Sequence, residues 1–337
     1  MKQIILTKPH CVAVRNIDEP NELKEHDVLI EVKMVTLCGS DLTYFNRSVL
    51  PYHLSYPIVL GHEVSGIVKK IGEKVTKVKD GDRVTVEPQY YCGKCDYCKN
   101  GQYNFCIESK FMASKGYQGA LSQYLVWDEK TVHRLDDSLS FEMGALLEPL
   151  SVAYSGVLKA KIKNESKVVI LGAGSIGVLA AKLIEILSPS TEYCIVDRFE
   201  QKILQAKRLG IEPTHFIKEP QDTELKFTHI IDTTGNAVLI NKYIKDAKFG
   251  CSLIMIGLSE TQFPLTIKEI VYKGLNISSV YRYTDTYPVL QELVKNSDVN
   301  FENIITHRFS LKQAQLAFEK ANDKENSMKV LIDFTIK

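Results

Sequence analysis

Residues 168–182 read Val-Val-Ile-Leu-Gly-Ala-Gly-Ser-Ile-Gly-Val-Leu-Ala-Ala-Lys, an apolar run that leads through a glycine-rich turn into a helical stretch. In this arrangement the first glycine permits a tight turn, the second lets a pyrophosphate approach the backbone, and the third packs helix on strand. The start of the helix would then face the phosphates. The sequence therefore predicts a dinucleotide-binding turn whose contacts come from Gly172, Gly174, Ser175, Ile176 and Gly177.

A carboxylate, Asp197, stands at the end of the next apolar run, residues 193–196. Its separation from the glycine turn is about that of the acid that binds the adenosine ribose hydroxyls in such folds. Because its charge would repel a 2′-phosphate, NAD is favoured over NADP, while the neighbouring Arg198 keeps NADP as the alternative. Asp232, at the end of a later run, is either structural or cofactor-binding.

Apolar runs separated by helical stretches continue along this part of the chain, and such alternation is typical of a doubly wound parallel sheet. The runs lie at 168–171, 193–196, 229–232, 253–257 and 277–280. We therefore expect an α/β fold in which residues 148–282 form a Rossmann-type nucleotide-binding domain.

The rest of the chain has a different pattern of apolar residues and turn signals. Residues 1–147 carry short β-type runs, such as 28–32 and 66–68, broken by glycine, proline and aspartate, which predicts an all-β domain. The tail looks unlike a nucleotide fold, and its expected elements are a helix ending near Val294, a strand at 304–309, a helix at 311–320 and a strand at 330–334. We expect one domain from 1–147 plus 283–337, with the active site in the cleft between the domains.

Four of the eight cysteines fall within fifteen residues, at Cys92, Cys95, Cys98 and Cys106. Four thiolates match the closed tetrahedral shell of a structural zinc, which can hold together a loop that has little core of its own. Ordinary free thiols seldom cluster so closely. An iron–sulfur cluster is the main competing interpretation, because it also takes thiolate ligands.

A second set of metal-binding residue types is dispersed. Cys38 lies in Cys-Gly-Ser-Asp, His62 and Glu63 lie in Gly-His-Glu, and Glu148 lies in Glu-Pro. Taken singly, such residues are most often a core thiol, a hydrogen-bonded imidazole and solvated carboxylates. Their joint occurrence ahead of a nucleotide fold favours a shared catalytic site.

The order of these motifs, ending in the glycine turn, resembles the zinc medium-chain dehydrogenase/reductase family over essentially the whole chain. Within that family, residues 281–288 with 306–309 most resemble the sorbitol and xylitol dehydrogenase branch. The resemblance implies a GroES-like β-rich catalytic domain beside the Rossmann domain, and hydride transfer between a secondary alcohol of a polyol and NAD. It further implies two zinc ions per subunit, one catalytic and one structural, and a homodimer or homotetramer.

By this resemblance Cys38, His62 and Glu63 bind the catalytic zinc, while Glu148 holds a water at the metal or exchanges with it. Which of Glu63 and Glu148 binds the ion in the resting state is open. A carboxylate ligand departs from the Cys₂His site of alcohol dehydrogenase. It would make the metal a harder Lewis acid, and we hypothesise that such a metal prefers a chelating vicinal diol.

The resemblance also implies roles around the metal. Because zinc lowers the pKa of an oxygen ligand, a substrate hydroxyl would lose its proton, and the carbon that bears the resulting alkoxide would pass its hydride to nicotinamide. Ser40 matches the hydroxyl that begins the family's proton relay, but Thr43 stands where many relatives have histidine, so the relay beyond Ser40 is open. The expected polyol contacts are Tyr44, Arg282 and Tyr283, with core packing for Tyr44 and a surface position for Arg282 as alternatives.

Other substrates fit the same architecture: L-threonine, sugar acids such as gulonate or idonate, and alditol phosphates. An anionic substrate needs a cationic anchor, for which Arg282 is the candidate. A protein of another class, a catalytically silent nucleotide-binding relative, is disfavoured because the metal-binding residue types are all retained.

Composition excludes several classes of partner. The chain has 42 Lys+Arg against 41 Asp+Glu, a formal charge of +1, so no global field would draw it to nucleic acid or anionic lipid. The apolar run near Met1 is far shorter than a signal-peptide core or the roughly 20 residues of a membrane span. Eight cysteines without an export signal indicate reduced thiols or metal ligands, and we expect a cytoplasmic protein.

Overall fold

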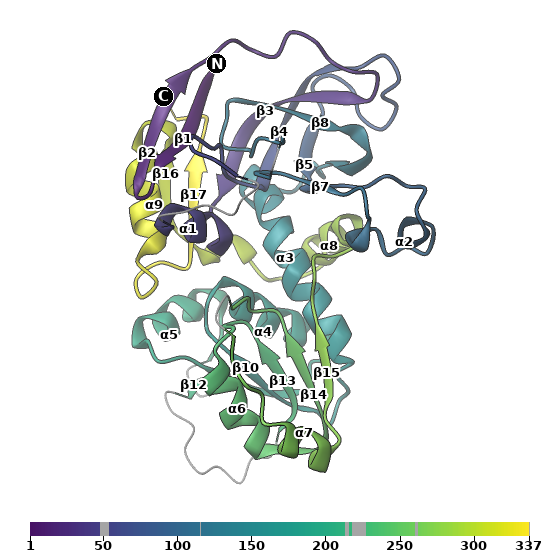
Figure 1. The fold of residues 1–337 in the computed structure, drawn as a ribbon, viewed down its shortest axis with the longest axis vertical. Coiled ribbons are helices and arrows are strands. Elements are labelled where there is room, and N and C mark those ends of the chain that lie inside the picture. The colour runs from purple at the N-terminus through teal and green to yellow at the C-terminus, as the bar shows by residue number, and fades with distance from the viewer. Residues whose placement is uncertain (48–53, 115, 213–215, 218–226, 260–261, 337) are drawn as a thin grey trace. The chain divides into compact units, whose positions relative to one another are not determined.

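The computed structural model describes residues 1–336 apart from 48–53, 115, 213–215, 218–226 and 260–261 (Figure 1). The chain forms two compact units. The first comprises Met1–Glu148, Thr284–Asn296 and Ile305–Lys337, and the second comprises Pro149–Tyr283 and Ser297–Ile304.

The first unit is built on a seven-stranded sheet in the order β16-β17-β3-β4-β5-β9, with β8 paired to β3. Its strands are β3 (Asp27–Thr36), β4 (Glu63–Ile71), β5 (Arg83–Val86), β8 (Tyr124–Asp128), β9 (Val132–Arg134), β16 (Ile305–Ser310) and β17 (Lys329–Asp333). The tail enters this sheet through β17, which runs antiparallel to β3 with Leu331 opposite Thr36. Alternate residues of β3, including Val28, Ile30 and Val32, are buried, as the period of two requires for a sheet with one face in a core.

Helices within residues 1–147 show that the expectation of an all-β domain there was wrong. They are α1 (Gly39–Asn46), α2 (Asp96–Lys99) and the start of α3 (Phe141–Ala160). The tail forms α8 (Thr286–Lys295) and α9 (Ala314–Asn322), which confirms the two helices expected there. The start of α1 is fixed by Asp41, whose carboxylate accepts from the backbone N–H of Cys38 at 2.9 Å. α9 lies beside β16 and β17 (Figure 1).

Short elements complete the first unit. β1 (Lys2–Lys8) pairs antiparallel with β2 (Cys11–Asn16), and β6 (Gln89–Tyr90) pairs with β7 (Lys110–Phe111). The short helix η1 (Tyr103–Phe105) lies inside the four-cysteine segment.

The second unit is a six-stranded parallel sheet in the order β12-β11-β10-β13-β14-β15, which confirms the doubly wound fold (Figure 1). Its strands are β10 (Lys167–Leu171), β11 (Glu192–Val196), β12 (Phe216–Ile217), β13 (Phe227–Asp232), β14 (Ala247–Met255) and β15 (Asn276–Ser279). The chain steps outward from β10 in one direction and then from β13 in the other. Because such crossovers are right-handed, α4 and α5 cover one face and α6 and α7 the other.

The bounds of these helices are α4 (Ser175–Leu187), α5 (Glu200–Ala206), α6 (Ala237–Asp246) and α7 (Ile267–Lys273). Residues 168–171 are wholly buried, and coverage of the central strands on both faces explains why their sequence is continuously apolar. Among the described residues, the structure contains no helix with the length and apolar character needed to cross a membrane.

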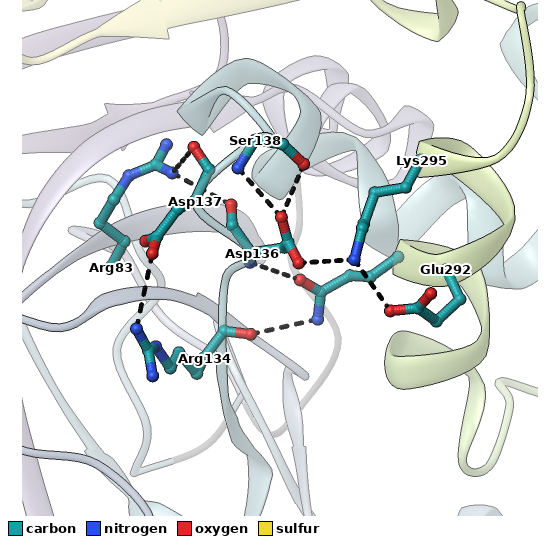
Figure 2. Close-up of polar contacts among 8 residues, drawn as sticks. Arg83, Arg134, Asp136, Asp137, Ser138, Glu292 and Lys295 are labelled. Atoms are coloured by element: carbon teal, nitrogen blue, oxygen red, sulfur yellow. Dashed lines mark hydrogen bonds and ion pairs between the residues drawn. The ribbon is translucent and has the colours of Figure 1, made fainter.

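The carboxylate of Asp136 joins α8 to the segment that follows β9 (Figure 2). One oxygen lies 2.8 Å from Lys295 Nζ, and the other accepts from the N–H and the hydroxyl of Ser138. The backbone N–H of Asp136 donates to the side-chain oxygen of Gln291, whose amide group donates to the carbonyl of Arg134. These contacts hold α8 along its C-terminal half.

Asp136→Asn is expected to lower the free energy of unfolding at about pH 7. The hydrogen-bonded ammonium of Lys295, together with Ser138, holds the pKa of Asp136 well below its usual range. Its stabilising contribution is therefore present above the pKa of about 3.9 in the unfolded chain and is lost as the pH falls toward the lower folded value. Urea denaturation should show a difference between parent and variant that is constant down to about pH 5 and shrinks below about pH 4.

Asp137→Asn is the matched control, because its side chain is 77% exposed and lies 3.6 Å from Arg134. Its effect on unfolding should be much smaller. Equal effects of the two substitutions would contradict the role given to Asp136.

Candidate metal centres and dinucleotide turn

The dispersed motifs of the first unit converge. The ligand atoms of Cys38, His62 and Glu63 all lie within 4.8 Å of one another. Antiparallel pairing of β3 with β4 places Thr36 opposite Glu63, so residues just beyond the end of β3 meet those at the start of β4. One thiol, one imidazole and one carboxylate at this spacing fit the ligand types and the size of a zinc site.

Asp41 organises this cluster, and the sequence analysis did not single it out. Its carboxylate accepts from the backbone N–H of Cys38 at 2.9 Å and from that of Gly61 at 3.0 Å. One oxygen also lies 3.8 Å from His62 Nδ1. Asp41 is buried, and this burial raises its pKa. It therefore joins the loop that carries the cysteine to the loop that carries the histidine. The sequence signal for this role was its place in Cys-Gly-Ser-Asp. Asp41 follows the N-cap residue Cys38 by three positions, where an acidic side chain can accept from the N-cap backbone.

Lys329 was also missed. Its ammonium lies 2.9 Å from each carboxylate oxygen of Glu63, and the hydroxyl of Thr36 donates to the same carboxylate. The side chains of Lys329 and Glu63 are only 4% and 1% exposed. Burial raises the pKa of Glu63, but Lys329, His62 and the hydroxyl of Thr36 together outweigh it, and the net shift is downward. The pair is thus an ion pair enclosed in the first unit.

Among the described residues, the 4.8 Å group contains Cys38, His62 and Glu63 but none of the other residues expected around the metal. Glu148 is buried on α3. Burial lowers the pKa of His62, but Cys38, Asp41 and, least of these, the charge of Glu148 raise it, and the net shift is upward. Ser40 and Tyr44 lie one turn apart on α1, and therefore on the same helix face. Arg282 and Tyr283 follow β15 in the second unit, where the guanidinium of Arg282 lies over the ring of Tyr281.

The four cysteines of the lobe, defined as residues 92–106, also converge. Sγ of Cys98 lies 3.5 Å from that of Cys95 and 3.9 Å from that of Cys92. A Zn–S bond of about 2.3 Å gives a tetrahedron with edges of about 3.8 Å, which agrees with these distances. A cluster of several irons would hold its thiolates further apart, because the irons lie between them. The spacing fits a single ion.

Backbone N–H groups point at the sulfur atoms of the lobe. Cys92 Sγ accepts from the N–H groups of Lys94 and Cys95, and Cys106 Sγ accepts from the N–H of Cys92 at 3.3 Å. Donation from the backbone of Cys98 lowers the pKa of Cys95 to about 6. The backbone N–H groups therefore stabilise the thiolates of Cys92 and Cys95, the form of cysteine that binds metal, whereas burial raises the pKa of Cys98 to about 12.

The glycine turn of the second unit has the shape that a dinucleotide requires. At Gly177 an added Cβ would lie 1.9 Å from the carbonyl oxygen of Gly172, so helix and strand can approach only with glycine there. At Gly174, by contrast, an added Cβ would meet no atom within 4 Å. This open side at the start of α4 leaves room for a phosphate beside free N–H groups of the helix terminus, where Ser175 and Ile176 are partly exposed.

Asp197 also helps to shape this turn. Its carboxylate accepts from the N–H of Ala173 at 2.8 Å and from that of Phe199 at 2.9 Å. A carboxylate offers about four acceptor positions, and these two N–H groups take two of them. Arg198 beside it is exposed. Asp232 has a structural role, because its two oxygens accept from the N–H groups of Thr234 and Gly235.

Comparisons with known proteins agree with this geometry. Residues 24–137 match the family model described as the alcohol dehydrogenase GroES-like domain. The chain is 31% identical to sorbitol dehydrogenase of Bacillus subtilis, over 98% of this chain and 97% of that protein. It is 33% identical to D-xylulose reductase of Saccharomyces cerevisiae, again over 98% and 97%. Among solved structures, galactitol-1-phosphate dehydrogenase from Escherichia coli matches 99% of this chain and 100% of its own with a TM-score of 0.88 and 26% identity.

Proposed function

Because the chain belongs to the zinc-type medium-chain alcohol and polyol dehydrogenase family, we propose that it transfers hydride between a secondary alcohol of a free polyol, of the sorbitol or xylitol kind, and NAD. One observation carries the proposal: a thiol, an imidazole and a carboxylate from separate segments converge within 4.8 Å in the unit that matches the alcohol dehydrogenase model.

Cys38, His62 and Glu63 would hold the catalytic zinc, with Glu148 as the nearby carboxylate that holds a water or exchanges as a ligand. A zinc ion bound there supplies a Lewis acid that makes a substrate hydroxyl more acidic. Asp41 fixes the loops of the first two ligands through the N–H groups of Cys38 and Gly61. Lys329 limits the freedom of Glu63 by holding its carboxylate in a buried ion pair.

The chain's own residues would move the proton and bind the polyol. Ser40 lies at the start of α1, two residues after Cys38, and we assign it the first proton-accepting hydroxyl. Thr43 stands where many relatives have histidine, and its hydroxyl donates to the carbonyl of Gly39 at 3.1 Å, so its proton is directed into the helix. Tyr44, Arg282 and Tyr283 would contact the hydroxyls of the polyol.

The lobe residues Cys92, Cys95, Cys98 and Cys106 would hold the second, structural zinc. Their sulfur spacing and the N–H groups directed at them support a four-thiolate site. All four ligands are used there, so this ion has no open position and takes no part in the chemistry.

NAD would bind at the glycine turn, with pyrophosphate over Gly172, Gly174 and Gly177 and at the N-terminus of α4, beside Ser175 and Ile176. Asp197 would accept the ribose hydroxyls and, through its charge, disfavour NADP. Arg198 is an exposed neighbour that would tolerate a phosphate only if Asp197 were neutralised.

We assign residues 1–147 plus 283–337 to a catalytic GroES-like domain and residues 148–282 to the NAD-binding domain. The two compact units support this division, although 297–304 groups with the second unit. We also propose a cytoplasmic location, because all eight cysteines are free thiols and metal-binding thiolates persist in a reducing compartment.

A homo-oligomer formed through the second unit is part of this proposal. β15 ends the sheet and pairs only with β14 among the described strands, and exposed apolar residues lie on it and on the neighbouring α7. They are Ile267, Val271, Tyr272 and Ile277. An apolar sheet edge is readily covered by the same edge of a second copy, which gives a dimer or, with a further contact, a tetramer. A single-chain mass in light scattering would contradict this arrangement.

A substrate panel tests the function. Zinc-loaded protein is given NAD or NADP with sorbitol, xylitol, ribitol, galactitol, gulonate, idonate, threonine, alditol phosphates and ethanol, and the reduced cofactor is followed. Turnover of a free alditol with NAD is expected. Turnover confined to threonine, a sugar acid or a phosphate would replace the substrate assignment, and no turnover at all would favour a silent nucleotide-binding protein.

A further inference from the structure

Tyr103 belongs to the four-cysteine lobe, but its side chain is buried. The residue is 5% exposed, and its ring stacks on that of Tyr91 with a centroid distance of 4.2 Å and an interplanar angle of 18°. Its carbonyl accepts from the side-chain amide of Gln89 at 2.8 Å. Because Tyr91 immediately precedes the lobe residue Cys92, closure of the lobe fixes both stacked rings.

The hydroxyl of Tyr103 bridges two segments that are far apart in sequence. It donates to Glu87 Oε2 at 3.2 Å, and its oxygen accepts from the backbone N–H of Asp285 at 2.6 Å. Glu87 is only 2% exposed. Burial, followed by the charge of Glu87, raises the pKa of Tyr103, so the hydroxyl keeps its proton and makes both bonds at once.

Asp285 is the last residue of a strained turn. It has a φ of 55° and Arg282 has a φ of 56°, in the left-handed region that aspartate tolerates but that is unfavourable for arginine. Such conformations persist where surrounding contacts hold them. The N–H of Asp285 is held by Tyr103, and the intervening Tyr283 is 5% exposed.

The helix that follows the turn is already fixed. The hydroxyl of Tyr287 donates to the carbonyl of Val86 at 3.1 Å, and its ring stacks on His133. Further along α8, Gln291 and Lys295 contact the segment around Asp136 (Figure 2). α8 is therefore fixed within the first unit. The hydrogen bond from the N–H of Asp285 to Tyr103 then fixes the backbone of the residue that precedes α8.

We propose that Tyr103 is a positioning residue that transmits order from the four-cysteine lobe to residues 282–285, and so to Arg282 and Tyr283 where they contact the polyol. This inference rests on the proposed function. It gives the lobe a role in substrate affinity, although its four cysteines take no part in the chemistry.

Tyr103→Phe tests the inference, because it removes the hydroxyl and leaves the ring stacked on Tyr91. The KM for the polyol should rise about three- to tenfold, the factor supplied by one lost hydrogen bond, while kcat, the KM for NAD and the zinc content stay unchanged. Hydrogen–deuterium exchange at the amide of Asp285 should accelerate by a similar factor. Tyr91→Phe, which removes a hydroxyl from the other ring of the same stack, is the matched control and should change neither quantity.

Three results would overturn the inference. An unchanged exchange rate at Asp285 would show that Tyr103 does not hold the turn. Faster exchange with an unchanged KM, or a loss of zinc that lowers all kinetic constants together, would leave Tyr103 a purely structural role. The exchange measurement needs no substrate, so an inactive parent protein would refute the proposed function without obscuring whether Tyr103 anchors Asp285.

Discussion

Cys38→Ser is expected to lower kcat/KM for the polyol by about 10³-fold or more. A Lewis acid in such a site supplies several kcal/mol of stabilisation to the reacting oxygen, and each 1.36 kcal/mol is a factor of ten in rate. The thiol lies within 4.8 Å of the ligand atoms of both His62 and Glu63, so its loss removes one of the three candidate zinc ligands. Metal analysis should show two zinc ions per chain in the parent and one in the variant.

Cys11→Ser is the matched control for this substitution. Cys11 is a partly buried free thiol on β2 and belongs to neither group of candidate ligands in the described part of the chain. It should leave both zinc content and turnover unchanged. Full turnover by Cys38→Ser with one zinc fewer would refute the catalytic role of this site.

Lys329→Met is expected to lower the free energy of unfolding of the zinc-free protein by about 3–5 kcal/mol, the usual cost of leaving one partner of a buried ion pair uncompensated. The side chains of Lys329 and Glu63 are 4% and 1% exposed, so water cannot solvate the remaining carboxylate. Methionine keeps most of the length and volume of lysine, which limits the contribution of a cavity. Urea denaturation followed by circular dichroism measures the change.

Lys320→Met provides the comparison at the surface. Lys320 lies 3.0 Å from Asp323, but the two side chains are 31% and 34% exposed. Its removal should cost less than about 1 kcal/mol. Similar losses for the two lysines would mean that the Lys329–Glu63 pair contributes no more than a solvated one.

The parts of the fold and site that the sequence predicted are those encoded by local patterns. Residues 168–177 combine a buried strand, a turn and a helix start, and the motif alone indicates the positive φ of Gly172 and the close helix–strand approach at Gly177. The four lobe cysteines are likewise close in sequence as well as in space. The doubly wound sheet followed from apolar runs that the structure covers on both faces.

The parts that were missed depend on contacts between distant segments. Lys329 reads as an ordinary polar residue before a strand, because its partner Glu63 is 266 positions away and buried lysines are rare. Tyr103 and Asp285 are separated by 182 positions. The all-β interpretation missed the helix α1 because this helix is short. Asp41, whose carboxylate caps its start, lies within a motif that was analysed for metal ligands alone.

The most direct test of the catalytic zinc site is the rate of NADH formation from the preferred free alditol as the more weakly held zinc is removed by a chelator and then restored. Metal analysis in parallel identifies the point at which one zinc per chain remains in the four-cysteine lobe. Turnover should disappear with the first zinc and return when that zinc is added back. Turnover that continues with one zinc per chain would refute a catalytic role for the zinc at Cys38, His62 and Glu63.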